Sequence, residues 1–260
     1  MKTEQTDVLL QDSPEVEAKD IVVEIANLTK SFGALEVLRD FSLTLYKGEN
    51  LVVLGKSGSG KSVLIKCIVG LLRADAGIIK VFDRDVTALT AREMDEVRQN
   101  IGFLFQSGAL YDSMTVKQNL EFPLRRIREH LKQKEIDAKI KEVLENVGLL
   151  DALNKMPAQL SGGMRKRISL ARTIVVDPKI ILYDEPTTGL DPVTSDEISL
   201  LINDVQKKYK ASSIIITHDI ECARMTANRL IMLQDGKSYK EGTLAQFEKS
   251  TDSTIKLFFK

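Results

Sequence analysis

Hydrophobic patterns of two kinds predict the strands of this chain. Residues 21–25 and 41–45 alternate apolar and polar side chains, which is typical of strands with one buried face. Residues 51–54, 180–183 and 214–217 are runs in which nearly every side chain is apolar, which are typical of strands covered on both faces. The last two runs each follow a helical pattern, so we expect βαβ units and a largely parallel sheet.

Helical periodicity occupies the middle of the chain. Residues 134–147 carry their apolar side chains on one stripe and their lysines and glutamates elsewhere, which predicts an amphipathic packing helix. Helical patterns extend over residues from about 107 to 175, and we expect these residues to form an α-helical lobe inserted into an α/β domain. Near the end, an Asp235-Gly236 turn between two short strand patterns predicts a hairpin.

The two ends of the chain differ from the domain between them. Residues 1–20 hold several acidic side chains around isolated apolar ones, which predicts a flexible tail. We expect one domain over residues 21–250 and a C-terminal tail over residues 251–260. Residues 257–259 in that tail are large and apolar, so they are a candidate partner surface.

Charge and composition exclude several classes of protein. Lys plus Arg and Asp plus Glu both number 37, so the chain has no basic surplus that would indicate a nucleic-acid partner, although this balance is compatible with a local basic patch. The polar start lacks the features of a signal peptide, and Cys67 and Cys222 are therefore interpreted as reduced core thiols of a cytoplasmic protein. No apolar run approaches the roughly 20 residues that cross a bilayer. Any role at a membrane would come through a partner.

A glycine-rich segment follows the predicted strand at residues 51–54 and precedes an apolar helical pattern, which is the context of a P-loop. Glycines let backbone N–H groups converge on phosphate oxygens, and the start of a helix adds partial positive charge. We expect Lys61 to span the β- and γ-phosphates of a nucleotide and Ser62 to bind Mg²⁺. The segment comprises Gly55, Lys56, Ser57, Gly58, Ser59, Gly60, Lys61 and Ser62.

Two adjacent carboxylates end the predicted strand at residues 180–183. Asp184 would hold Mg²⁺ at the carboxyl edge of the sheet, where open α/β sheets bind ligands. Because the chain turns there, Glu185 can reach a water aligned on the γ-phosphate and act as a general base. Taken alone, an Asp-Glu pair at a strand end is more often a solvated turn. The P-loop favours the catalytic interpretation.

Ser161, Gly162 and Gly163 open another predicted helix. The simplest interpretation is a serine N-cap followed by two glycines. Glycine at a helix start costs up to roughly 1 kcal/mol relative to Ala, a cost better explained if bare N–H groups must approach an anion. This segment is therefore a candidate for a second phosphate-binding surface.

These motifs, with Gln106, Gly189-Leu190-Asp191-Pro192 and His218, occur in the order and spacing of ABC-transporter nucleotide-binding subunits. The chain resembles that family over residues 21–242. The resemblance implies a P-loop NTPase fold with a RecA-like core, a small antiparallel β part near the N-terminus and a helical lobe that carries the signature Leu160-Ser161-Gly162-Gly163. It also implies ATP and Mg²⁺ as ligands.

The resemblance assigns three further residues to the site within one chain. Phe32 would stack on adenine, Gln106 would sense Mg²⁺ and the attacking water, and His218 would contact the γ-phosphate. Each has a plainer alternative: a core aromatic, a solvated amide at a strand end and a turn histidine, respectively.

The resemblance also implies a head-to-tail dimer with a second copy of the chain. Asp191 would bridge the two copies, and Ser161, Gly162 and Gly163 would cap the γ-phosphate of the other copy. The chain departs from the commonest pattern at Met164, where the family usually has Gln, and at Gly189, where it usually has Ala. These departures affect details of the dimer contact and remove no ligand.

Residues 103–116 and the run Leu160 to Arg167 resemble more closely the ATPases of MCE-type phospholipid transporters. That resemblance implies an integral-membrane permease, an MCE-domain protein and a STAS-domain protein as partners, with this chain on the cytoplasmic face of the inner membrane. Leu110, Tyr111, Met114 and Phe122 would suit a groove for a permease helix, although they could equally pack the helical lobe.

Three other classes remain as alternatives. Soluble ABC ATPases that act on nucleic acid or translation usually carry two ABC units or a long coiled coil, and this chain has neither. An ABC ATPase of iron–sulfur assembly shares the catalytic motifs. A P-loop kinase or GTPase has no use for Ser161, Gly162 and Gly163.

Overall fold

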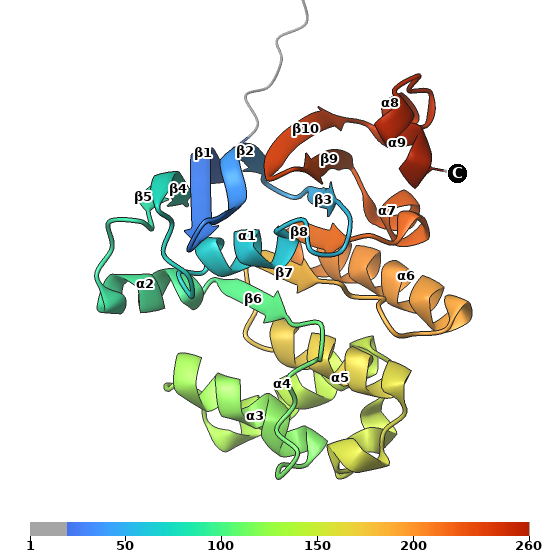
Figure 1. Cartoon of the computed structure of the whole chain (residues 1–260). Helices are drawn as coiled ribbons and strands as arrows, with labels where there is room; N and C mark the ends of the chain where they lie inside the picture. Colours follow the sequence, from blue (N-terminus) through green and yellow to red (C-terminus); the bar gives the residue numbers. More distant parts are fainter. Residues whose placement is uncertain (1–19, 260) are drawn as a thin grey trace, which may run out of the picture.

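A computed structural model describes residues 20–259, which form two sheets flanked by helices (Figure 1). The larger sheet has the order β10-β9-β3-β8-β7-β6, and only the pairing of β10 with β9 is antiparallel. Its strands are β3 (Asn50–Leu54), β6 (Ile101–Leu104), β7 (Ile180–Asp184), β8 (Ser212–Thr217), β9 (Arg229–Gln234) and β10 (Lys237–Gly242). The expected parallel sheet is confirmed.

The smaller sheet is antiparallel and has the order β2-β1-β4-β5. Its strands are β1 (Ile21–Phe32), β2 (Leu35–Tyr46), β4 (Ala76–Val81) and β5 (Arg84–Asp85). The first two strands extend beyond the alternating patterns of the sequence and meet at the turn that contains Gly33, where φ is +60°.

The helices fall into two groups. The inserted lobe follows β6 and precedes β7 in the chain, and it lies below both sheets in Figure 1, with α5 in contact with β6. It contains α3 (Val116–Ile127), α4 (Gln133–Asn146), η1 (Leu150–Ala152), η2 (Pro157–Gln159) and α5 (Gly162–Ile174). The remaining helices belong to the sheet-containing core. They are α1 (Lys61–Ile68), α2 (Ala91–Arg98), α6 (Pro192–Tyr209), α7 (Ile220–Thr226), α8 (Leu244–Glu248) and α9 (Ser253–Phe258).

Burial on both faces explains the continuous apolar runs. In β3, Leu51 and Val53 join the apolar cluster between the two sheets, whereas Val52 and Leu54 join the cluster that faces α6 and the helical lobe. Successive side chains of a strand point to opposite faces, so each face needs its own apolar set. This arrangement buries β3 in the centre of the larger sheet, directly before the glycine-rich segment.

The end of the chain is a packed helix where the sequence pattern predicted a tail. Ile255 of α9 is fully buried, and the rings of Phe247 and Phe259 lie with centroids 6.0 Å apart. Phe258 also packs against the core, so only Leu257 of the candidate partner surface is largely exposed, at 64%. The flexible tail predicted for residues 1–20 lies outside the described residues, except for residue 20, and so does residue 260.

The two cysteines are free and buried, as expected for core thiols. Burial raises the pKa of both the Cys67 and the Cys222 thiol to about 11, which keeps them protonated near neutral pH. Within residues 20–259, none of the helices combines the length and apolarity needed to span a bilayer.

Candidate functional site

Four neighbouring parallel strands deliver the predicted site residues to one edge of the sheet. The P-loop follows β3, His218 follows β8, Glu185 follows β7 and Gln106 follows β6. Because these strands run in the same direction, their carboxyl ends lie together, and polar loops converge there. Segments up to about 160 residues apart in the chain therefore meet at a single site.

The P-loop backbone passes where side chains do not fit. A Cβ on Gly55 would lie 2.7 Å from the Leu233 carbonyl oxygen. Gly60 has φ +101°, and a Cβ there would lie 2.8 Å from Val37 Cγ1. Ser59 Oγ is buried and has no hydrogen-bond partner among the described residues. A crowded glycine-rich turn with an unsatisfied hydroxyl at a helix start fits a site for phosphate oxygens.

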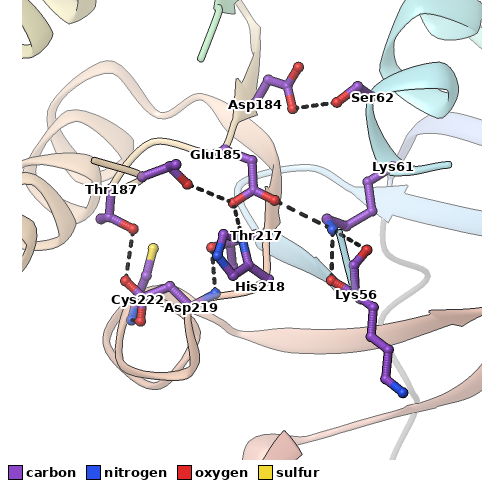
Figure 2. A network of polar contacts seen from close by, with 12 residues as sticks. Lys56, Lys61, Ser62, Asp184, Glu185, Thr187, Thr217, His218, Asp219 and Cys222 are labelled. Carbon is purple, nitrogen blue, oxygen red and sulfur yellow. Dashed lines mark hydrogen bonds and ion pairs between the residues drawn. The ribbon is translucent and has the colours of Figure 1, made fainter. Parts of the chain in front are cut away.

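Lys61 is only 5% exposed and points back into the P-loop. Its Nζ donates to the carbonyl oxygens of Gly55 at 2.6 Å and Lys56 at 2.9 Å, and it lies 3.4 Å from Glu185 Oε1 (Figure 2). Burial lowers the pKa of the Lys61 ammonium, while the carboxylates of Glu185 and Asp184 oppose that shift. A phosphate that approaches Lys61 therefore competes with the Glu185 carboxylate.

Ser62 and Asp184 place two hard oxygen groups side by side at the start of α1 and the end of β7. Ser62 Oγ donates to Asp184 Oδ1 at 3.0 Å, and burial raises the pKa of the Asp184 carboxyl, partly offset by that hydrogen bond. Within residues 20–259 there is no group of three His, Cys, Asp or Glu side chains placed to hold a metal. This pair fits Mg²⁺, which typically keeps several waters and takes one or two protein ligands plus substrate phosphates.

Glu185 is held in place from several sides. Its carboxylate contacts His218 Nδ1 at 2.8 Å (Figure 2). The carboxylate also accepts a hydrogen bond from Thr188 Oγ1 at 3.1 Å, and the backbone N–H of Glu185 donates to the Ile216 carbonyl at 2.9 Å. Its φ is +50°, a left-handed conformation that is costly for a residue with a side chain. The Asp184-Glu185 pair is thus buried and fixed, and the solvated-turn alternative is wrong.

Phe32 and Gln106 lie at the surface. Phe32 ends β1, is 47% exposed and has the Lys30 ammonium 5.4 Å from its ring centroid, so it is not a core aromatic. The Gln106 side chain is exposed, and its backbone carbonyl accepts a hydrogen bond from Lys166 at 2.8 Å. Both side chains are accessible to a ligand. Their roles toward adenine and Mg²⁺ remain predictions.

The signature segment has roles within its own chain. Ser161 Oγ accepts the Met164 N–H at 3.2 Å and caps α5, as the simplest interpretation of the sequence expected. A Cβ on Gly163 would lie 2.7 Å from Thr194 Cγ2, so close packing already requires glycine there, and an approaching anion is not needed to explain it. At Gly162 the nearest atom to a Cβ would be Leu190 Cδ2 at 3.8 Å, which leaves this position open.

Asp191 likewise has a role in its own chain. Its carboxylate accepts the Thr194 N–H at 3.0 Å and the Thr194 hydroxyl at 2.6 Å, and these hydrogen bonds hold its pKa below the usual range. It is the N-cap of α6. Among the hydrogen bonds of residues 20–259, none joins residues 161–163 to residues 55–62.

Two contacts to this site carry no recognisable signal in the sequence. Thr188, which holds the Glu185 carboxylate, lies in a Thr-Thr-Gly loop that carries no distinctive spacing signal. Lys166, which reaches the backbone of Gln106 and Glu185, lies in a run of three basic residues that resembles a solvated face.

Comparisons with known proteins agree with this geometry. The ABC transporter family model matches residues 38–188. The probable ribonucleotide transport ATP-binding protein mkl of Mycobacterium leprae (strain TN) is 44% identical over 215 residues, which cover 82% of this chain and 61% of that protein. The methionine import ATP-binding protein MetN of Rhizobium johnstonii (strain DSM 114642 / LMG 32736 / 3841) is 37% identical over 233 residues, which cover 90% of this chain and 64% of that protein. The chain thus spans less than two thirds of the length of these relatives.

Solved structures lead to the same family. The dimeric post-hydrolysis structure of the ATP-binding cassette MJ0796, bound to ADP and Pi, has a TM-score of 0.78 and 32% identity, and the match covers 85% of this chain and 98% of that one. The structure of cbiO1 from Clostridium perfringens has a TM-score of 0.79 and 27% identity over 86% and 89% of the two chains. With its P-loop, buried Asp-Glu pair and helical lobe, the chain belongs to the ABC transporter family of ATP-binding proteins and carries the ATP-hydrolysing domain of that family.

Proposed function

We propose that this chain is the ATP-binding and hydrolysing subunit of an ABC transporter and acts as a head-to-tail dimer. The observation that carries the proposal is the contact of Glu185 with both Lys61 and His218 beside the Ser62–Asp184 pair. A base, a phosphate-binding lysine and a metal-ligand pair at one sheet edge are the parts that phosphoryl transfer to water requires.

The residues of the chain have separate tasks in this reaction. Lys61 exchanges its contact with Glu185 for phosphate oxygens, and the glycine-rich turn supplies N–H groups. Glu185, oriented by His218 and Thr188, accepts a proton as the water oxygen bonds to the γ-phosphorus and the bond to ADP breaks. Mg²⁺, which Ser62 and Asp184 would hold, neutralises charge on the phosphates when it is bound.

Lys61→Ala should weaken nucleotide binding. It removes a buried ammonium aimed at the phosphate site, and charge-assisted hydrogen bonds of this kind are worth about 1.5–3 kcal/mol, or about 10- to 100-fold in affinity. The measurement is titration of the purified protein with a fluorescent ATP analogue. Lys141→Ala, an exposed lysine of α4, is the matched control with unchanged affinity. Full affinity in Lys61→Ala would remove the P-loop assignment.

The dimer proposal rests on an uncrowded backbone position at the start of α5 and on a dimeric structure of similar fold. Gly162 is uncrowded at the start of α5, so its backbone can approach a ligand outside the chain. MJ0796, which shares the fold, forms a dimer in a structure that contains ADP and Pi. In the proposed dimer Ser161, Gly162 and Gly163 meet the γ-phosphate of the other copy, and Asp191 lies near the contact between copies.

For the substrate we propose phospholipid, moved through a permease together with an MCE-domain protein, with a STAS-domain protein as a further partner. The support is the likeness of residues 103–116 to MCE-type ATPases and the similarity to mkl. The name of mkl refers to ribonucleotide transport and that of MetN to methionine import, so other substrates are the competing outcomes. The subunit would work at the cytoplasmic face of the inner membrane.

A preformed surface beside Gln106 supports a permease contact. Tyr111 and Phe122 are 41% and 40% exposed, with ring centroids 5.4 Å apart, and Arg172 lies 4.7 Å from the Tyr111 ring. Tyr111 and Arg172 border a hollow of about 390 Å³ between the start of the lobe and α5. The buried Asn119 side chain accepts a hydrogen bond from the Tyr111 N–H at 2.8 Å and donates one to the Tyr111 carbonyl at 3.1 Å. These two hydrogen bonds fix the backbone of the loop that carries Tyr111.

Capture of partners from solubilised membranes tests the transport proposal. Tagged Glu185→Gln protein with ATP should retain a permease and an MCE-domain protein, identified by mass spectrometry. The same protein carrying Tyr111→Glu and Phe122→Glu should lose the permease and keep ATP binding. A different permease would overturn the lipid assignment, and a complex without any membrane protein would favour a soluble ABC ATPase such as that of iron–sulfur assembly.

A further inference from the structure

One lysine of the helical lobe reaches the catalytic edge of the sheet. Lys166 lies on α5, in the turn that follows the signature, and is only 5% exposed. Its Nζ donates to the backbone carbonyl of Gln106 at 2.8 Å and makes a longer contact of 3.4 Å with the backbone carbonyl of Glu185. A single ammonium thus bridges the segments that follow β6 and β7.

The neighbouring basic residues behave differently. Arg165 donates to the Leu160 carbonyl at 3.2 Å within the start of its own helix, and Arg167 forms an ion pair with Glu197 on α6. Only Lys166 of this run points into the site. Burying an ammonium is costly unless hydrogen bonds and nearby charges compensate, and here two carbonyls and the carboxylates of Asp184 and Glu185 do so.

The two carbonyls belong to residues whose side chains have proposed roles in hydrolysis. Glu185 has a left-handed backbone, so the direction of its carbonyl and the placement of its side chain are coupled through a strained turn. Gln106 opens the loop that leads into the lobe. Movement of α5 relative to the sheet would strain or break the hydrogen bonds of Lys166, and both segments would lose a restraint.

We propose that Lys166 is a positioning residue for ATP hydrolysis, which sets the backbone of Gln106 and Glu185 according to the position of the signature helix. The proposal rests on the roles proposed above for those two residues. Lys166 forms no hydrogen bond with residue 61 or residue 62, so we expect it to act on the placement of the base and of Gln106 and to leave nucleotide binding by the P-loop unchanged.

The test is steady-state ATP hydrolysis by Lys166→Met, which keeps the length of the apolar stem and removes the donors. We expect kcat to fall about 10- to 100-fold, because small misplacement of catalytic groups has effects of that size, while KM for ATP changes less than about threefold. Lys166→Arg, which restores N–H donors, should recover at least about a third of the wild-type kcat. Lys141→Met in the same lobe is the control with unchanged kcat.

A lysine that only stabilises the fold would not lower kcat selectively when it is replaced by Met. An unchanged kcat in folded Lys166→Met, or a parallel change in kcat and KM, would overturn the proposal. If the Met variant does not fold, as judged by circular dichroism and thermal melting, Lys166→Gln is measured in its place. We again expect a lower kcat with little change in KM, and an unchanged kcat or a parallel change in kcat and KM would again overturn the proposal. The assignment of Glu185 as the base is tested independently of Lys166, because an error in that assignment would appear as normal turnover in Glu185→Gln.

Discussion

Replacing Glu185 with Gln lowers ATP turnover by about 10²- to 10⁴-fold, the usual contribution of a general base. The amide keeps the shape of the side chain and the contacts with His218 and Thr188, but it cannot accept the proton of the attacking water. ATP affinity is retained or increased, because the variant removes the carboxylate that lies 3.4 Å from Lys61 in the nucleotide-free chain. Phosphate release and nucleotide titration measure the two effects.

The same variant should accumulate as an ATP-bound dimer, which size-exclusion chromatography with light scattering detects. Hydrolysis reopens the dimer, so blocking it leaves the closed state populated. Glu145→Gln, an exposed carboxylate of α4, serves as the control and should turn over ATP normally without a trapped dimer. Unchanged turnover in Glu185→Gln would remove Glu185 as the base.

Ser161→Arg should reduce turnover by about 100-fold or more, because a large side chain would fill the seat of the γ-phosphate and displace the reacting groups. Loss of the α5 cap costs only about 1 kcal/mol, so the variant remains folded. Ser161→Asn, which can still cap the helix without a long side chain, separates the two effects. Normal turnover in Ser161→Arg would contradict a site shared between two copies.

Mixing a variant impaired in the signature with a variant impaired in the P-loop tests the shared site directly. A heterodimer of Ser161→Arg and Lys61→Ala contains one site with both an intact P-loop and an intact signature. Random pairing in a symmetric dimer then restores about a quarter of wild-type turnover if the two sites act independently. A site completed within one chain shows no recovery above the sum of the separate variants.

Local sequence patterns were sufficient to predict those elements and site residues whose signal lies within one segment of the chain. The run at β3 is apolar on both faces because both faces are covered. In the P-loop that follows it, Gly55 and Gly60 lie where a side chain would collide with Leu233 or Val37. By contrast, α9 is short and is stabilised by the burial of Ile255 and the packing of Phe259 against Phe247. These are tertiary contacts, so no local pattern predicts this helix. At Gly163, a Cβ would meet Thr194 of α6, and this packing reason for a glycine is visible only in the tertiary structure.

The sequence by itself determined the chemistry of this protein: a P-loop, an Asp-Glu pair at a strand end and a signature helix that begins at a serine cap. Each of these depends on residues close together in the chain. The tertiary structure alone decided how the parts act on one another. It placed Glu185 against both Lys61 and His218, and it turned Lys166 inward onto two carbonyls. Those contacts arise from the order of the strands and the docking of the lobe, which are set by the packing of segments far apart in the chain.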